Sequence, residues 1–281
     1  MALSKGEKQT LDNLGYIPMQ PVTEEHVRYL LSDECPRSKQ DKQFILKQYG
    51  TPKGMQFDIN QLITPVVLEY LEPGWHEQTM QCLLNAGFDE QENILQIGRE
   101  GVGSMSKAFN RVFEGAYGFD LITTPYVWFV TNITFDKHVP SFMAAALDEY
   151  PDVAAIHPKF VSDHPHIRHA KGREYVPFVE WTAPMIRVDA LRDVGLLDEQ
   201  LPYVGQDIDW SHRAKCKGWG LMADGFSTVQ HTYLRHTQNP APITQIRGAL
   251  RNVYTKSTEN RLVEKWGVEW RKLLCPSNSC G

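Results

Sequence analysis

The sequence lacks the patterns that mark several large protein classes. None of its apolar runs approaches the roughly 20 residues that a membrane-spanning helix needs, and its first residues, MALSKGEKQTLDNLGY, contain no apolar core of the kind found in secretory signals. The 29 basic and 34 acidic residues give a net charge of -5, so no general cationic field favours nucleic-acid binding.

Cysteine is scarce and shows no functional spacing. The sequence contains no C-x-x-C pair and no zinc-ribbon pattern. The five cysteines are Cys35, Cys82, Cys216, Cys275 and Cys280. We therefore expect free thiols in a reducing compartment and a cytoplasmic protein without stable membrane insertion.

Four common enzyme motifs are also missing. There is no P-loop, no G-x-S-x-G and no H-E-x-x-H, and Gly101-Val102-Gly103 lacks the third glycine of a dinucleotide-binding G-x-G-x-x-G. These absences lower the expectation for the corresponding nucleotide hydrolases, esterases, metalloproteases and dehydrogenases.

The arrangement that is present is an alternation of strands and helices. A β-branched run begins at Ile63, and strand-like runs follow at 92–98, 126–133 and 152–160. Helix-like runs lie between them at 75–88, 104–116 and 141–150. The residues from His164 to Glu174 show no period and are interpreted as a loop. This order predicts an α/β fold with a mostly parallel sheet flanked by helices.

The predicted domain organisation has three parts. Residues 1–60 are polar and carry two helix-like stretches, so they predict an N-terminal helical extension. Residues 61–240 form the α/β domain, and residues 241–281 form a helical tail packed on it.

The densest polar cluster within the apolar second half is GQDIDWSHR, residues 205–213. Asp207 and Asp209 stand at the start of a predicted helix, where carboxylates favour the helix dipole. Asp209 and Arg213 are four residues apart and share a helix face. The cluster is compatible with a helix-capping acid and one ion pair, or with a catalytic site.

Several segments resemble, in the same order, inverting family 2 glycosyltransferases of the GT-A (Rossmann-like) fold, including rhamnosyltransferase-like members. The segments span about Ile63 to Trp270. They are EGVGSMSKAFN, YVWFVTNITFDKHVPSFMAAALDEYPDVAAIHPKF, DVGLLDEQLPYVGQDIDWSHRAKCKGWGLMADGFSTVQH and RLVEKWGVEW. The resemblance implies transfer of a sugar from a nucleotide-sugar donor, linked to UDP or dTDP, to an acceptor hydroxyl with inversion.

The resemblance also assigns roles to individual residues. Asp207 takes the position of the general base, which must accept the proton of the acceptor hydroxyl. Tyr70, Glu72, Gly103, Asn132 and Thr134 fall on the donor side. Trp181, Asp209 and Arg213 fall on the acceptor side, and His231 and Asp136 are the candidate metal contacts. Asp209 and Arg213 either scaffold the acceptor loop or touch the substrate, Tyr70 either stacks on the base or packs in the core, and His231 either contacts the metal or diphosphate or is structural.

The sequence departs from the family pattern at the metal turn. Thr134 stands where a metal-binding carboxylate belongs, and hard cations prefer charged oxygen ligands. We therefore expect any Mg²⁺ or Mn²⁺ to bind weakly and only with the donor. The loop that contains Arg168, Lys171 and Arg173 is either a cationic substitute that neutralises the diphosphate or a solvated loop.

Two other functions remain compatible with these residues. The acceptor is a carbohydrate in the first interpretation, but a hydroxymethylated DNA base, as in phage DNA glycosyltransferases, is the alternative. The second alternative is a non-catalytic module that binds a sugar or nucleotide, as the Thr134 substitution would allow.

Overall fold

The computed structural model describes residues 59–68, 73–89, 94–97, 104–114, 118–131, 133–161, 170, 172–202, 204–231 and 256–274. The chain divides into two compact units, residues 1–58 and residues 59–281. Residues 1–58 of the predicted N-terminal extension lie outside the described residues, whereas Ile59 and Asn60 belong to α4 (Ile59–Leu62) of the second unit. The fold below is that of the second unit.

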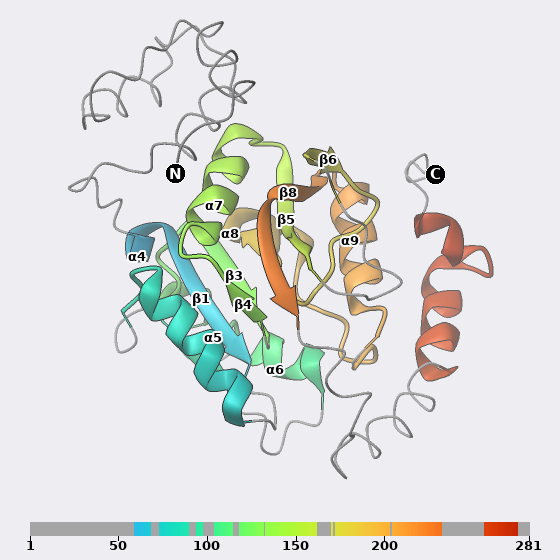
Figure 1. The fold of residues 1–281 in the computed structure, drawn as a ribbon. Coiled ribbons are helices and arrows are strands. Elements are labelled where there is room, and N and C mark those ends of the chain that lie inside the picture. The colour runs from blue at the N-terminus through green and yellow to red at the C-terminus, as the bar shows by residue number, and fades with distance from the viewer. Residues whose placement is uncertain are drawn as a thin grey trace, which may run out of the picture. The chain divides into compact units, whose positions relative to one another are not determined.

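The second unit is built on one eight-stranded mixed sheet (Figure 1). The strands are β1 (Ile63–Leu68), β2 (Leu95–Ile97), β3 (Tyr126–Val130), β4 (Ile133–Phe135), β5 (Val153–Phe160), β6 (Arg173–Tyr175), β7 (Met185–Arg187) and β8 (Gly220–His231). Their order is β2-β1-β3-β7-β5-β8-β4, with β6 also paired to β8. The strands β1, β2, β3, β5 and β8 run in one direction, whereas β4, β6 and β7 run against them. The predicted α/β class with a mostly parallel sheet is confirmed.

Helices connect the strands and cover the sheet. They are α4 (Ile59–Leu62), α5 (Pro73–Asn85), α6 (Met105–Arg111), α7 (Val139–Glu149), α8 (Val188–Val194), α9 (Gln206–Cys216) and a C-terminal helix at 256–266, with 3-10 turns η1 (Gly118–Leu121) and η2 (Trp270–Leu274). Pro140 in the first turn of α7 lacks the N–H that would be unpaired there.

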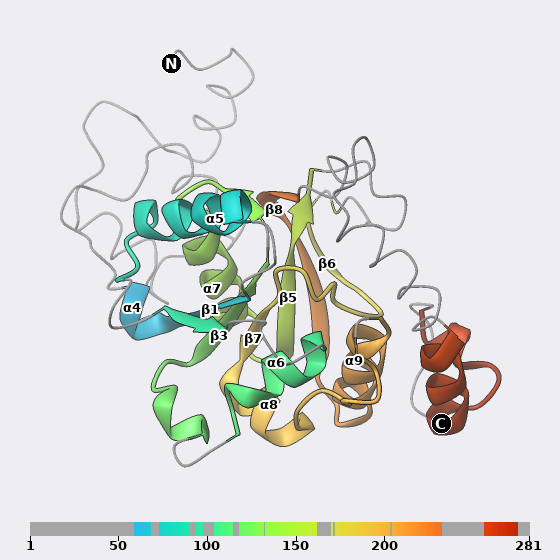
Figure 2. The same ribbon diagram turned by 90° about the horizontal axis from the view of Figure 1, so that it is seen from below.

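Helices lie on both faces of the sheet (Figure 2), and the buried side chains form a core layer on each face. Alternate residues of β3 point to opposite faces. Trp128 packs with side chains of α5 and α7, such as Leu83 and Met143. Phe129 packs with side chains of α6, α8 and α9, such as Phe109 and Trp210. Both faces are apolar because both are covered, which explains the unbroken apolar sequence of the strand.

The structure differs from the sequence-based expectations in two strands and one cysteine. The run at 126–133 is two strands, since β3 pairs with β1 and β7 while β4 pairs with β8. The expected loop at 164–174 ends in a strand, β6, whose Arg173 pairs with Asp224 of β8. Cys216 is disulfide-bonded rather than a free thiol, and its partner lies outside the described residues, whereas Cys82 is free.

The topology brings several elements to one edge of the sheet. The strands β1, β2, β3, β5 and β8 all end there because they run in the same direction. Helix α6 follows β2 and α9 precedes β8, so both helices begin at this edge. Ligands of open α/β sheets bind at the carboxyl ends of the strands. This edge is therefore the candidate ligand-binding edge of the sheet.

Candidate active site

The loop that leads into α9, residues 195–205, is held from one side by α6. The Met105 amide donates to the Pro202 carbonyl at 2.8 Å, and the Ser106 hydroxyl donates to the Leu201 carbonyl at 2.5 Å. The side chain of Asn110 exchanges two hydrogen bonds, of 2.9 and 3.0 Å, with the backbone of Leu197. The buried polar residues of α6 therefore fix the course of this loop.

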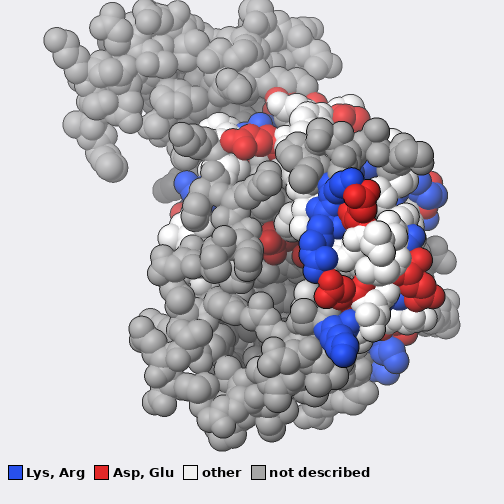
Figure 3. Space-filling model, turned by 90° about the vertical axis from the view of Figure 1, so that its right-hand side faces the viewer, with Lys and Arg blue, Asp and Glu red and all other residues white. Residues whose placement is uncertain are grey.

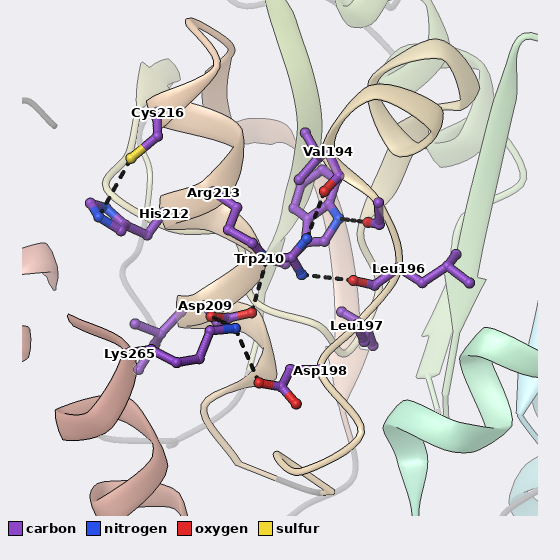
Figure 4. Close-up of polar contacts among 12 residues, drawn as sticks. Val194, Leu196, Leu197, Asp198, Asp209, Trp210, His212, Arg213, Cys216 and Lys265 are labelled. Carbon is purple, nitrogen blue, oxygen red and sulfur yellow. Dashed lines mark hydrogen bonds and ion pairs between the residues drawn. The ribbon is translucent and has the colours of Figure 1, made fainter.

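Helix α9 holds the same loop through Arg213 (Figure 4). The Arg213 guanidinium donates to the Asp209 carboxylate at 3.0 Å and to the carbonyls of Val194 and Leu196 at 2.7 Å each. The Trp210 indole donates to the Gly195 carbonyl at 2.9 Å. These contacts fit the scaffolding role that the sequence leaves open for Asp209 and Arg213, because the Asp209 side chain is completely buried.

The C-terminal helix, residues 256–266, holds the loop from a third side. Lys265 lies between two carboxylates, 3.0 Å from Asp198 and 2.5 Å from Asp209. The Trp266 indole donates to Asp209 at 3.0 Å, and Arg261 donates to Asp198 at 2.9 Å. The tail thus completes the charge balance of the buried Asp209.

Gly205 allows the C-terminal helix to pack closely against the start of α9. Its φ of +85° is in the left-handed region, and a Cβ atom there would lie 2.7 Å from Thr258 Cγ2. The Thr258 hydroxyl donates to the Val204 carbonyl at 3.0 Å. The chain therefore enters α9 by a turn that is available to glycine and packed directly under the tail.

Asp207 lies in the first turn of α9, at the shared edge of the sheet, and is half-buried. The Ile208 amide donates to its carboxylate at 2.9 Å. Burial raises the pKa of Asp207 to about 6, although amides of the helix N-terminus act in the opposite direction. Asp207 is thus a carboxylate that is ionised at neutral pH yet basic enough to take a proton.

Glu180 is a second carboxylate at this place, and the sequence interpretation missed it. Burial, and next the charge of Asp207, raise the pKa of Glu180 to about 8. Its one sequence signal is an acidic residue within the apolar run VPFVEWTAPM. Only the tertiary structure brings it near α9.

Trp181 is not available to bind the acceptor, contrary to the expectation from the sequence. It is only 3% exposed, and its ring packs against Phe109, Phe129 and Trp210 with centroids 5.3 to 6.3 Å apart. Because the ring is buried among these side chains, it offers no surface on which a sugar could stack. Trp181 supports the site from within the core.

Two buried polar atoms near Asp207 have no hydrogen-bond partner among the described residues. They are the side-chain carbonyl oxygen of Gln206 and the indole nitrogen of Trp181. Buried polar atoms are rarely left unpaired. Gln206 and Trp181 are the chain neighbours of Asp207 and Glu180, and their unpaired atoms are compatible with water or a polar ligand at this end of α9.

The candidate metal contacts are not brought together. β4 and β8 pair antiparallel with Ile133 opposite His231 and Thr134 opposite Gln230, so Asp136 lies three residues along the ladder from the position opposite His231, or about 10 Å away. Asp136 is exposed and accepts a hydrogen bond from the His138 amide at 3.0 Å. No group of three or more His, Cys, Asp or Glu side chains suited to a metal occurs within the described ranges. The described residues therefore do not fit a protein-built metal site.

Arg173 does not belong to a cationic loop that could neutralise a diphosphate. Its side chain is 6% exposed and lies 2.5 Å from Glu149 and 3.7 Å from Asp224. Since its charge is balanced inside the fold, Arg173 is not available to neutralise a diphosphate. Arg168 and Lys171 lie outside the described residues, as do the donor-side candidates Tyr70, Glu72, Gly103 and Asn132.

Comparison with known proteins adds to this geometry. No protein-family model and no curated protein matches the sequence. Among solved structures, the crystal structure of GalNAc-T7 with UDP, GalNAc and Mn²⁺ is similar with a TM-score of 0.53 and 13% identity, covering 75% of this chain and 50% of that chain. This chain thus spans about half the length of that protein.

Structures of S. aureus TarS are similar over a comparable range. TarS 1-349 has a TM-score of 0.49 and 13% identity over 76% of this chain and 69% of that chain. The same fragment in complex with UDP has a TM-score of 0.49 and 12% identity over the same shares. At these identities the similarity concerns the fold, and the chain has the α/β GT-A fold that the sequence predicts.

Proposed function

We propose that this protein is an inverting glycosyltransferase in which Asp207 is the general base. It transfers a sugar from a nucleotide-sugar donor, linked to UDP or dTDP, to a hydroxyl of the acceptor. The observation that carries the proposal is the half-buried Asp207 carboxylate at the start of α9, at the ligand-binding edge of a GT-A sheet.

The chemistry follows from the position of one base. The acceptor oxygen attacks the anomeric carbon while its proton passes to Asp207. The bond from that carbon to the donor diphosphate breaks in the same displacement. A single displacement at carbon inverts its configuration, so no covalent sugar–enzyme intermediate is needed.

The loop contacts support the precision that such a step requires. Positioning of reacting groups supplies a large part of enzymatic rate acceleration, and small displacements reduce it strongly. Here α6, Arg213 and the C-terminal helix hold the segment that ends at Asp207 from three sides.

GalNAc-T7 was crystallised with UDP and Mn²⁺, and we propose that this chain also uses a nucleotide donor. Because its described residues do not form a metal cage, a divalent cation would be held chiefly by the donor diphosphate.

The acceptor is proposed to be a carbohydrate. Figure 3 shows basic and acidic side chains interspersed on the face that carries α9 and the C-terminal helix. Lys217 at the end of α9, and Arg271 and Lys272 in η2, each lie within 3 Å of a carboxylate. Such balanced charge favours a neutral sugar over a polyanionic acceptor.

The test is a transfer assay with the full chain. UDP- and dTDP-linked sugars are offered with an oligosaccharide panel and, separately, with hydroxymethylated DNA, and release of nucleoside diphosphate is measured. We expect release that depends on a carbohydrate acceptor. Release that depends on the DNA would make nucleic acid the acceptor, and donor binding without transfer or hydrolysis would identify a non-catalytic module.

A further inference from the structure

The segment 179–181 lies against the first two turns of α9. The Val179 amide donates to the Ser211 hydroxyl at 3.1 Å, and the rings of Trp181 and Trp210 pack edge-to-face at 5.3 Å. Glu180 is the residue between these two contacts. Asp207 shares the helix face of Ser211, because the two are four residues apart. The backbone of Glu180 therefore lies about one helical turn from Asp207, and the charge of Asp207 acts on the Glu180 carboxyl.

Among the residues that the structure describes, no cation forms an ion pair with either carboxyl. Arg213 and Lys265 bind Asp209, and Arg261 binds Asp198. The other charged or titratable groups on the described elements packed here lie on α6, α9, the loop 195–205 and the C-terminal helix. They are Lys107 and Arg111, which are exposed on α6, His212 and Lys215 on α9, Glu199 on the loop, and Lys256, Glu259 and Glu264 on the C-terminal helix. The charge that acts on Glu180 is that of Asp207, and two neighbouring carboxylates without a counter-ion do not readily ionise together.

We propose that Glu180 and Asp207 form one carboxyl pair that shares a single proton, in which Glu180 holds the proton so that Asp207 carries the negative charge and serves as the base. This inference rests on the proposed function for its catalytic meaning. Glu180 is a positioning residue in this scheme, since it acts through Asp207.

The direction of the pKa shifts agrees with this division. Burial raises the pKa of both carboxyls, to about 6 for Asp207 and, with the added repulsion from Asp207, to about 8 for Glu180. Between these values the pair holds one proton. In each turnover Asp207 gains the acceptor proton as the new C–O bond forms and the bond to the diphosphate breaks. The pair then releases one proton to water before the next cycle.

The first test is the pH profile of transfer. The wild type should show a rate that rises near pH 6, as Asp207 ionises. The rate should fall near pH 8, because an ionised Glu180 repels the Asp207 carboxylate and displaces it from the acceptor hydroxyl. Glu180→Gln keeps a neutral side chain of the same size but cannot ionise, so the pH profile should retain the rise and lose the fall. A fall near pH 8 that persists in Glu180→Gln, or an equal loss at every pH, would overturn the pair.

The second test does not depend on activity. Between pH 7 and 8.5 the folded wild type retains a proton on Glu180 that the unfolded chain has lost, so the midpoint of thermal unfolding should fall as pH rises. Glu180→Gln should flatten this slope, whereas the exposed control Glu269→Gln should not. His157 does not titrate in this window, because burial lowers its pKa to about 4.

The two tests separate the inference from the proposed function. If no donor and acceptor support transfer but Glu180→Gln flattens the stability slope, the pair is supported and the glycosyltransferase assignment fails. If the slope is unchanged by Glu180→Gln, the pair is overturned whatever the activity.

Discussion

The two sides of the ligand-binding edge are built very differently. On the side of α9, the loop at 195–205 receives side-chain hydrogen bonds from α6, α9 and the C-terminal helix. On the side of β4, Thr134 stands in a three-residue strand and Asp136 is exposed. One side has its carboxylates fixed by the fold, and the other offers no fixed carboxylate among its described residues.

The difference indicates that the two sides have different tasks in the proposed reaction. General-base catalysis needs a carboxylate in a defined place, whereas a leaving diphosphate can be neutralised by a mobile ion or by side chains. A protein can therefore keep a rigid general base on the side of α9 while the side of β4 loses its affinity for a metal. The predictions below test this contrast, from the largest expected effect to the smallest.

Replacing the base should have the largest effect. Asp207→Asn keeps the shape but cannot accept a proton, so transfer should fall by about 100- to 10,000-fold, while calorimetry shows little change in donor affinity. Asp189→Asn, on α8 and 80% exposed, is the matched control and should transfer at the wild-type rate. Unchanged turnover in Asp207→Asn would remove this residue from the mechanism.

Arg173 should matter for stability and not for donor binding. Arg173→Met leaves two carboxylates without their buried partner, which should lower the free energy of unfolding by about 3 to 5 kcal/mol. The exposed pair of Arg192 should contribute at most about 1 kcal/mol, so Arg192→Met is the control. Denaturant unfolding measures both. A stable Arg173→Met protein with weakened donor binding would restore the diphosphate role.

Gly205 should couple the tail to catalysis. Gly205→Ala and Gly267→Ala both place alanine at a positive φ, at a cost of about 1 kcal/mol or more each. Only the Cβ at 205 meets Thr258, whereas nothing lies within 4 Å of the one at 267. Gly205→Ala should therefore lose more stability and also transfer rate. Equal losses in the two variants would mean that the contact with the tail does not position the loop.

The metal side should give the smallest effects. The purified protein alone should retain no stoichiometric divalent metal by elemental analysis, and Mn²⁺ should bind measurably only with a nucleoside diphosphate. EDTA should reduce transfer only partially, and Asp136→Ala should change it little, because Asp136 is about 10 Å along the ladder from His231. Tight metal in the protein alone, lost in Asp136→Ala, would identify Asp136 as a ligand.

The sequence predicts the periodic parts of this molecule well. The helix at 139–149 and the strand at 153–160 follow from local apolar spacing, and the start of α9 follows from the acidic cluster at 206–209. These features depend on neighbours within a few residues. Their prediction requires no knowledge of tertiary contacts.

The parts that sequence could not give depend on distant partners. Burial in the folded chain raises the pKa of Glu180, and the charge of Asp207, 27 positions later in the chain, raises it further. Arg173 looks like a member of a cationic loop until Glu149 and Asp224 are seen beside it. In the sequence, a tryptophan that stacks on a sugar cannot be told from a buried one. The packing of Trp181 against Trp210 identifies it as a core residue.

The most direct test of the account is the configuration of the product. A donor of known anomeric configuration is incubated with the protein and its acceptor, and the new glycosidic bond is assigned by proton NMR before it can equilibrate. A single displacement with Asp207 as base predicts complete inversion at the anomeric carbon. A product that retains the donor configuration would contradict the mechanism, because it requires a second displacement or a front-face attack in which this base has no such role.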